Sequence, residues 1–272
     1  MSRPSASRPG VAVHREGTRS VVRSLPEEVP VAMVFDGTTQ AVMMATPAEI
    51  ADFAYGFALS EGIIAHPGEV AEFEAVTHAR GIEARFWLHE APGRDLRERQ
   101  RSMMGPTGCG LCGIDSLEQA LRPLPRLPEG GPSLTRAEVA RATDELRGHQ
   151  PLHDQTRAVH AAGFLLPGRG IVMAREDVGR HNALDKLIGA LARQDMDASE
   201  GAVVLTSRVS VDMVQKTVLS RCPILIAVSA PTALALSMAE EAGLTLAAFA
   251  RGGGFDLYAA PERIVDGASH VA

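Results

Sequence analysis

The strongest constraint on the fold is the regular alternation of short apolar runs with helix-length segments across residues 135–249. We expect helices near residues 135–148, 182–193, 209–220 and 232–242, and strands at 161–166, 171–175, 202–206, 224–228 and 244–249. Strands that alternate with helices of this length connect through right-handed crossovers and form a sheet covered by helices on both faces. The sequence therefore predicts an α/β domain over residues 134–272.

The first part of the chain follows a different pattern. Residues 1–20 are polar and rich in arginine and serine, which predicts a disordered tail. The segment that follows should form a helix and several short strands, the strands at 31–35, 41–44, 73–76 and 82–88. This pattern predicts a smaller α+β N-terminal domain over residues 21–122.

Two local signals support elements of this N-terminal domain. Asp36-Gly37 lies between the first two expected strands and is typical of a hairpin turn. Thr46, Pro47 and Glu49 combine a helix N-cap, a first-turn proline and a capping-box acid. The sequence therefore predicts a β-hairpin followed at once by a helix.

Prolines and glycines mark the boundary between the two domains. Pro123, Pro125 and Pro128 precede a Glu-Gly-Gly-Pro segment, which predicts a linker over residues 123–133. The chain has 272 residues, of which 45% are hydrophobic, enough to bury a full core.

Composition excludes several classes of protein. The sequence contains no run of about eighteen apolar residues, and its first ten residues lack the apolar block of a signal peptide. A net charge of −6 and an aromatic content of 4% are unlike a nucleic-acid-binding surface. We therefore expect a cytoplasmic protein with neither a membrane nor a nucleic acid as partner.

The cysteine pair Cys109 and Cys112 is the clearest sign of chemistry. Four glycines and a proline surround it within residues 105–113, which favours a solvent-reachable loop. A helix expected to begin near Ser116 would bring its positive end close to the pair and lower a thiol pKa from its reference value of about 8.5. A larger thiolate fraction makes thiol exchange faster.

The pair is compatible with three chemistries: thiol-disulfide exchange, half of a metal site, and persulfide transfer. A structural zinc site needs four ligands, but the remaining cysteine, Cys222, lies in an apolar strand segment typical of a buried residue. We therefore expect no structural metal. Spacing alone does not separate disulfide exchange from sulfur transfer.

Polar or glycine-rich turns follow four of the later strands, at residues 176–182, 207–210, 229–232 and 251–254. If these strands share a direction, the turns meet at one edge of the sheet, where α/β proteins bind ligands. Serine hydroxyls, helix N-termini and arginines at such an edge suit phosphate groups. The alternative is that the serines and threonines are helix caps and the arginines are solvated or ion-paired.

Several motifs together resemble the formate dehydrogenase accessory sulfurtransferase family, over roughly residues 29–258. They are the cysteine motif at 109–113, the run Glu-Asp-Val-Gly-Arg-His-Asn-Ala-Leu-Asp-Lys at 176–186, Ser-Arg-Val-Ser at 207–210 and Ser-Ala-Pro-Thr at 229–232. The resemblance implies a cytidine-deaminase-like second domain. The deaminase zinc signature is missing, so base hydrolysis is not expected, and His160 is expected to be structural or substrate-facing.

The resemblance also implies a function. A protein of this family would accept sulfur from a cysteine desulfurase as a cysteine persulfide and pass it to the molybdenum bis(molybdopterin guanine dinucleotide) cofactor. The protein would bind this cofactor as a substrate, and the added sulfur would make formate dehydrogenase active. Cys109 would carry the persulfide, with Cys112 as its partner. The cofactor-binding segment would be Phe249, Ala250, Arg251, Gly252, Gly253 and Gly254.

Further contacts to this guanine-nucleotide-bearing pterin are expected at the polar turns. The candidates for its phosphates and polar groups are Arg180, His181, Asn182, Ser207, Arg208, Lys216 and Ser229. Two rival functions stay open at this point, a thiol-disulfide oxidoreductase that uses the cysteine pair and a non-enzymatic chaperone that only binds the cofactor. Apolar surface on the first domain would allow a homodimer.

Overall fold

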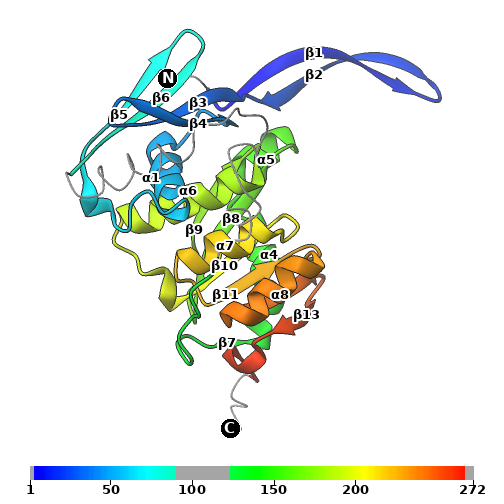
Figure 1. Ribbon diagram of the computed structural model, residues 1–272. Coiled ribbons are helices and arrows are strands. Elements are labelled where there is room, and N and C mark those ends of the chain that lie inside the picture. The colour runs from blue at the N-terminus through cyan, green and yellow to red at the C-terminus, as the bar shows by residue number, and fades with distance from the viewer. Residues whose placement is uncertain (1–2, 90–122, 267–272) are drawn as a thin grey trace.

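The computed structural model describes residues 3–89 and 123–266, arranged as an N-terminal sheet, a larger C-terminal sheet and a projecting two-stranded arm (Figure 1). Cys109, Cys112 and the helix expected from Ser116 lie outside the described residues. Within residues 3–89 and 123–266, none of the helices combines the length and the apolar character that crossing a membrane requires.

The N-terminal sheet has the strand order β4-β3-β6-β5, formed by β3 (Val29–Phe35), β4 (Thr38–Ala45), β5 (Val70–His78) and β6 (Gly81–Leu88). β3 and β4 pair antiparallel around Asp36-Gly37, which confirms the expected hairpin. Helix α1 (Ile50–Ser60) packs on this sheet through Phe53, and the rings of Phe35 and Phe86 stack with 4.7 Å between centroids. Aromatic packing thus gives the small sheet its own core.

Residues 5–26 form a two-stranded hairpin, where the sequence predicted disorder over residues 1–20. β1 (Ser5–His14) and β2 (Gly17–Pro26) pair antiparallel over ten residue pairs and project from the body as an arm (Figure 1). Val11 and Val13 are two residues apart in β1, and Val21 and Val22 are adjacent in β2; these β-branched residues favour extended structure despite the polar composition. The expectation of disorder was therefore wrong here.

Helix α1 begins later than its capping signal predicts. Its N-cap is Glu49, in the left-handed region with φ 47°, and the cap has no side-chain hydrogen bond. Thr46 instead faces the C-terminal part of the chain: its amide donates to Asp177 Oδ2 at 2.9 Å, and its hydroxyl accepts from the Val178 amide at 3.1 Å. These tertiary hydrogen bonds replace the local capping box.

The C-terminal sheet has the strand order β13-β12-β11-β10-β8-β9. Its strands are β8 (His160–Leu166), β9 (Gly170–Asp177), β10 (Ala202–Leu205), β11 (Ile224–Ala227), β12 (Thr245–Arg251) and β13 (Gly254–Ala259). The helices are α4 (Arg136–Arg147), α6 (Arg180–Arg193), α7 (Val211–Leu219) and α8 (Ala233–Ala242). These elements confirm the predicted alternation, whereas β13 and the short helix α5 (Pro151–Thr156) were not predicted.

Helices cover both faces of this sheet, as the alternation predicts. α4 packs on one face, where Val139 and Leu146 meet Val204 and Ile226. α6, α7 and α8 share the core of the other face, which contains Val203 and Leu225. Neighbouring residues of one strand thus point into different cores, and the near-continuous apolar runs of β10 and β11 follow from burial on both sides.

Helices α1 and α6 join the two parts of the molecule. They touch at Gly56 and Gly189, where a Cβ atom on Gly56 would lie 1.7 Å from the carbonyl oxygen of Asp185. A Cβ on Gly189 would lie 1.9 Å from the carbonyl oxygen of Asp52. The absence of side chains at these two positions lets the helix backbones approach closely, so α1 is fixed against the C-terminal part.

The expected linker is packed against the C-terminal part. Leu127 is buried in its core, and the Leu127 amide donates to the carbonyl oxygen of Ala242 at 2.8 Å. The buried Arg263 guanidinium donates to the carbonyl oxygens of Pro128 at 2.8 Å and Gly130 at 2.9 Å. Prolines and glycines interrupt regular structure here without making the segment independent of the core.

Candidate functional site

The four polar turns lie at one edge of the C-terminal sheet. β10, β11 and β12 run parallel, and β9 shares their direction because both β9 and β10 are antiparallel to β8. The antiparallel β8 begins at this edge with His160, opposite Asp177. This arrangement confirms the prediction that the turns meet at one edge. Four strand spacings separate β9 from β12, so the edge is about 19 Å wide.

Three helices begin at this edge. Thr232 caps α8, since its hydroxyl accepts from the Ala235 amide at 3.2 Å, as the helix-cap alternative predicted. The N-caps of α6 and α7, Gly179 and Ser210, make no side-chain capping bond. The first amides of α6 and α7 therefore keep their hydrogen-bonding capacity and their partial positive charge, a combination that binds anions.

Buried polar atoms without partners mark the same place. Arg180 Nε, His181 Nε2 and Ser210 Oγ are buried and make no hydrogen bond within the described parts of the chain. His181 Nε2 lies 3.6 Å from Asp212 Oδ2, beyond a normal hydrogen bond. Such groups are costly unless something satisfies them, so this cluster is the best candidate in the structure for contact with a polar ligand.

The two histidines near Arg180 are held neutral. Burial, together with the Arg180 guanidinium, lowers the pKa of His181 to about 4 against the opposing effect of Asp212. Burial and the same guanidinium lower the pKa of His160. A neutral imidazole can both donate and accept a hydrogen bond, whereas the positive charge of the cluster rests on Arg180.

Asn182 has a structural task at this edge. Its Nδ2 donates to the carbonyl oxygen of Met44 at 2.8 Å and to Asp177 Oδ1 at 2.9 Å. Asp177 is fully buried and also accepts from the Gly179 amide at 2.8 Å, while Lys186 Nζ lies 2.8 Å from its Oδ2. This network fixes the turn that presents Arg180 and His181.

Lys216 is a corrected expectation, because it is not a free cation for phosphate. The side chain is buried, and Nζ donates to Ser60 Oγ at 2.8 Å, to Asp185 Oδ1 at 2.9 Å and to Glu61 Oε1 at 3.2 Å. Burial alone would lower the pKa of Lys216, but the Asp185 and Glu61 carboxylates outweigh it and raise the pKa. The charge of Lys216 is thus neutralised within the protein.

The turns after β10 and β11 are bonded to each other. The Val209 amide donates to the carbonyl oxygen of Ala230 at 3.1 Å, and the Thr232 amide donates to that of Val209 at 2.9 Å. Ser207 is buried, with its hydroxyl donating to the carbonyl oxygen of Arg208 at 2.9 Å. The Arg208 residue is exposed at the surface of the edge, so of this pair the arginine is the one that can reach a ligand.

Residues 249–254 comprise the end of β12, the two-residue turn Gly252-Gly253 and the first residue of β13. Arg251 pairs with Gly254, and Gly252 and Gly253 have φ of 61° and 79°, as a tight hairpin turn requires. A Cβ at either glycine would meet no atom within 4 Å, so the turn itself explains these glycines. Arg251 is exposed, Phe249 is partly exposed, and the buried Ala250 accepts a hydrogen bond from Thr143 Oγ1 at 2.6 Å.

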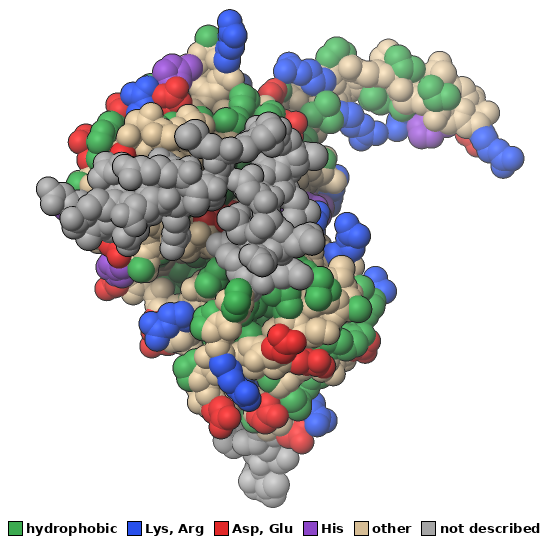
Figure 2. Space-filling view, viewed as in Figure 1, with side chains coloured by type: hydrophobic (Ala, Val, Ile, Leu, Met, Phe, Trp, Pro, Cys, Tyr) green, Lys and Arg blue, Asp and Glu red, His purple; other side chains and the backbone are tan. Residues whose placement is uncertain are grey.

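The sequence prediction missed the anchoring pair Asp177 and Lys186. The available signal was a lysine inside a helical run that is otherwise nearly apolar, residues 183–191, because a charged residue there needs a buried partner. The view in Figure 2 shows the exposed charges spread over the surface, with hydrophobic side chains between them over the C-terminal part. The cluster at Arg180 is distinguished by its unpartnered atoms more than by surface charge.

Comparisons with known proteins agree with one another. A model of the FdhD/NarQ family matches residues 26–265. A protein named sulfur carrier protein FdhD from Agrobacterium fabrum is 49% identical over 252 residues, covering 92% of this chain and 93% of that protein. One with the same name from Variovorax paradoxus is 52% identical over 237 residues, covering 87% and 85%.

A solved structure has the same overall fold. The crystal structure of a candidate formate dehydrogenase accessory protein from Desulfotalea psychrophila superposes with a TM-score of 0.76 at 25% sequence identity. The superposition covers 97% of this chain and 100% of the other. The mixed α/β architecture is therefore shared over nearly the whole length of both chains.

Proposed function

Because this chain belongs to the FdhD/NarQ family, we propose that it is a sulfurtransferase, a sulfur carrier that serves formate dehydrogenase. The observation that carries the proposal is the match to sulfur carrier proteins, at 49% and 52% sequence identity over most of both chains. The donor in this proposal is a cysteine desulfurase in the cytoplasm. The acceptor is the molybdenum bis(molybdopterin guanine dinucleotide) cofactor, bound as a substrate.

The proposed chemistry uses the two cysteines in order. The Cys109 thiolate attacks the outer sulfur of the desulfurase persulfide, a new S–S bond forms on Cys109, and the desulfurase leaves as a thiolate. The Cys112 thiolate then attacks the inner sulfur of the Cys109 persulfide. The S–S bond of the persulfide breaks, and the outer sulfur leaves as sulfide, with the electron pair of that bond, to be bound by the metal of the substrate. The two cysteines are oxidised to a disulfide, and this oxidation supplies the two electrons that reduce the transferred sulfur to sulfide.

The sheet edge is the proposed binding site of the cofactor. Its diphosphates suit Arg180, Arg208 and Arg251 together with the open N-termini of α6 and α7. The unpartnered atoms of His181 and Ser210 supply hydrogen bonds to its polar groups. Phe249, Ser207 and Ser229 complete the edge, and Asn182 holds the turn in place.

The strand order supports one further part of the proposal. An antiparallel β8 lies between β9 and the parallel strands β10, β11 and β12. We take this order, with helices on both faces, as the cytidine-deaminase-like arrangement that the sequence motifs imply. In this protein the edge would bind a nucleotide-bearing cofactor without the hydrolytic zinc site.

Reconstitution of the client enzyme tests the proposal. Formate dehydrogenase isolated without its sulfur ligand would be incubated with a cysteine desulfurase, cysteine and this protein, and formate oxidation measured. The Cys109→Ala variant should give no activation. The matched control is Cys222→Ala, because burial raises the pKa of the Cys222 thiol to about 12 and removes it from sulfur exchange. Full activation by Cys109→Ala would overturn the proposal.

The two rival functions predict different outcomes in the same assay. A thiol-disulfide oxidoreductase would turn over disulfide substrates without a desulfurase and would need both Cys109 and Cys112. A cofactor chaperone would tolerate the loss of both cysteines and would fail on substitution of Arg251. The sulfurtransferase needs the desulfurase, both cysteines and the sheet edge together.

A further inference from the structure

Asp212 does not suit a site that binds phosphate alone. It lies in the first turn of α7, and its Oδ2 is 3.6 Å from Nε2 of His181, at the start of α6. Both side chains are 32% exposed, so a ligand at the sheet edge can reach them. Because a carboxylate repels phosphate, the diphosphate contacts of the proposed function give Asp212 no role.

The neighbouring histidine does not neutralise the Asp212 carboxylate. Burial and the Arg180 guanidinium hold His181 neutral, with a pKa of about 4. The 3.6 Å between Asp212 Oδ2 and His181 Nε2 exceeds a normal hydrogen bond, and the described residues donate no hydrogen bond to this carboxylate. Asp212 therefore keeps its two acceptor oxygens for a ligand.

His181 and Asp212 together present one donor beside two acceptors. His181 Nε2 is buried without a partner in the described parts of the chain, and a neutral imidazole can donate from this atom. The complement of a donor and two acceptors is a ring edge with a carbonyl oxygen, a ring N–H and an amino group in a row. Guanine has this edge, with its O6, N1–H and N2 amino group. The separation of 3.6 Å lets the two side chains contact neighbouring atoms of one ring.

The same pair of side chains disfavours adenine. Adenine has an amino group where guanine has O6, and its N1 is an acceptor instead of a donor. A carboxylate that meets this acceptor gains no hydrogen bond and repels its lone pair. A site built to bond N–H groups rejects an analogue without them, because its own polar groups are then left unpaired.

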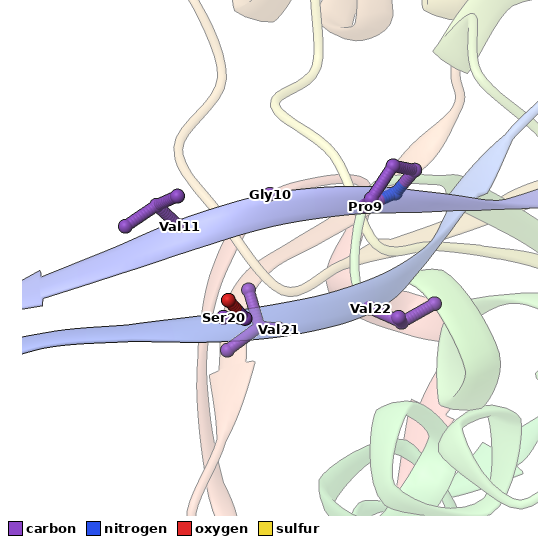
Figure 3. Close-up of a pocket in the computed structure, with 6 residues that line it drawn as sticks. All are labelled: Pro9, Gly10, Val11, Ser20, Val21 and Val22. Carbon is purple, nitrogen blue, oxygen red and sulfur yellow. The ribbon is translucent and has the colours of Figure 1, made fainter.

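Two pockets away from the sheet edge do not offer this combination. The pocket beside α5 contains Glu176 and Glu49, but both oxygens of Glu176 already accept from backbone amides of α5 at 2.8 Å. Glu49 lies 3.8 Å from Lys186 Nζ. The pocket on the β1–β2 arm (Figure 3) has no charged side chain in its lining, which consists of Pro9, Gly10, Val11, Ser20, Val21 and Val22.

We propose that Asp212 and His181 select the guanine base of the ligand at the sheet edge. Asp212 accepts hydrogen bonds from N1–H and the N2 amino group, and His181 Nε2 donates to O6. Arg180, Arg208 and Arg251 remain for the diphosphate. The inference rests on the proposed function, whose cofactor carries guanine nucleotides. A pterin ring has the same 2-amino-4-oxo edge, so the experiment includes a pterin as a separate ligand.

Calorimetry of the full chain with GDP, IDP, ADP and XDP tests the selection. Wild type should bind GDP about 10-fold more tightly than IDP, which lacks the amino group, and on the order of 100-fold more tightly than ADP. Asp212→Asn should weaken GDP binding by about 10- to 100-fold and prefer XDP, because the new amide donates to the 2-oxo group of xanthine. Glu241→Gln is the matched control, since it removes the same charge from an exposed residue in the last turn of α8.

The sign of the Asp212→Asn effect separates base selection from simple charge. If Asp212 only repelled phosphate, its loss would strengthen the binding of all four nucleotides. If it only stabilised the start of α7, its loss would lower the free energy of unfolding and leave the base preference unchanged. Either result would overturn the proposal.

Two further arms identify the ring and isolate the proposed function. Neopterin monophosphate is compared with GMP, and a loss of affinity in Asp212→Asn that is confined to the pterin would overturn the assignment to guanine. A wild type that binds none of the nucleotides would overturn it as well. Persulfide formation on Cys109, measured on the same protein, then shows whether sulfur transfer stands without base selection.

Discussion

Lys186 Nζ lies 2.8 Å from Asp177 Oδ2, and neither side chain is exposed to solvent. The lysine also donates to the carbonyl oxygens of Thr46 at 3.1 Å and Glu176 at 3.3 Å. One buried ion pair thereby ties the segment that leads into α1, the end of β9 and helix α6 together. It holds the turn that presents Arg180 and His181 at the sheet edge.

Removing one partner of this pair should be strongly destabilising. Lys186→Met leaves the Asp177 carboxylate buried without its cation, and we expect the free energy of unfolding to fall by about 3–5 kcal/mol. Urea denaturation followed by circular dichroism measures the loss. Asp154→Asn, which breaks the exposed pair with Arg147, is the control and should lower the free energy of unfolding far less, because water screens an exposed ion pair. Equal effects of the two substitutions would contradict this role for the buried pair.

The contact between α1 and α6 should not tolerate a methyl group. Gly56→Ala places a Cβ 1.7 Å from a backbone carbonyl oxygen, so the helices must separate. We expect a loss of at least about 1–3 kcal/mol in the free energy of unfolding, despite the better helix propensity of alanine. Gly10→Ala in the arm, whose Cβ would lie 3.8 Å from Val21 Cγ2, should change stability by less than about 0.5 kcal/mol. A stabilised Gly56→Ala variant would refute the close approach.

His181 should make the protein less stable in mild acid. Its pKa is about 4 when folded and near 6.5 when unfolded, so the unfolded chain binds more protons between these values. His181 therefore leaves the free energy of unfolding unchanged well above pH 6.5. As the pH drops from 6.5 toward 4, the free energy of unfolding falls. Between pH 7 and pH 5, wild type should lose up to about 2 kcal/mol more than His181→Gln. An equal loss in both proteins would show that His181 titrates normally.

Arginines at the sheet edge should bind guanine nucleotides. Arg180→Ala and Arg251→Ala should each weaken GDP binding in calorimetry by about 10- to 100-fold, because each removes a charged hydrogen-bond donor for phosphate. Arg136→Ala is the control, since α4 packs on the opposite face of the sheet from α6. In wild type, GDP should also slow hydrogen exchange at residues 249–254. Unchanged exchange and unchanged affinity would remove this edge as the nucleotide site.

The sequence predicted the C-terminal sheet well because its signals are local and strong. β10 and β11 are short apolar runs buried on both faces, and each is followed by a helix of unambiguous length. Their shared direction follows from the crossover rule, so the gathering of the turns at one edge was also predictable. The capping box of Thr135 and Glu138 begins α4 near the predicted residue.

Two of the failures, at Thr46 and Lys216, share a physical cause, which is bonding to distant parts of the chain. Thr46 looked like a helix cap, but Asp177, 131 residues away, takes its amide. Lys216 looked like a free cation, yet its partners Ser60 and Asp185 lie on other helices. Spacing within one segment cannot reveal such partners. The arm is a separate case, because its disorder was predicted from polar composition, whereas its β-branched residues favour two paired strands.

The most direct test of sulfur transfer is mass spectrometry of the protein after incubation with a cysteine desulfurase and cysteine. We predict one added sulfur on the tryptic peptide that contains Cys109 and Cys112, lost in Cys109→Ala and absent from the peptide that contains the buried Cys222. With a competent donor present, an unmodified Cys109 peptide, or sulfur that persists in Cys109→Ala, would contradict the account.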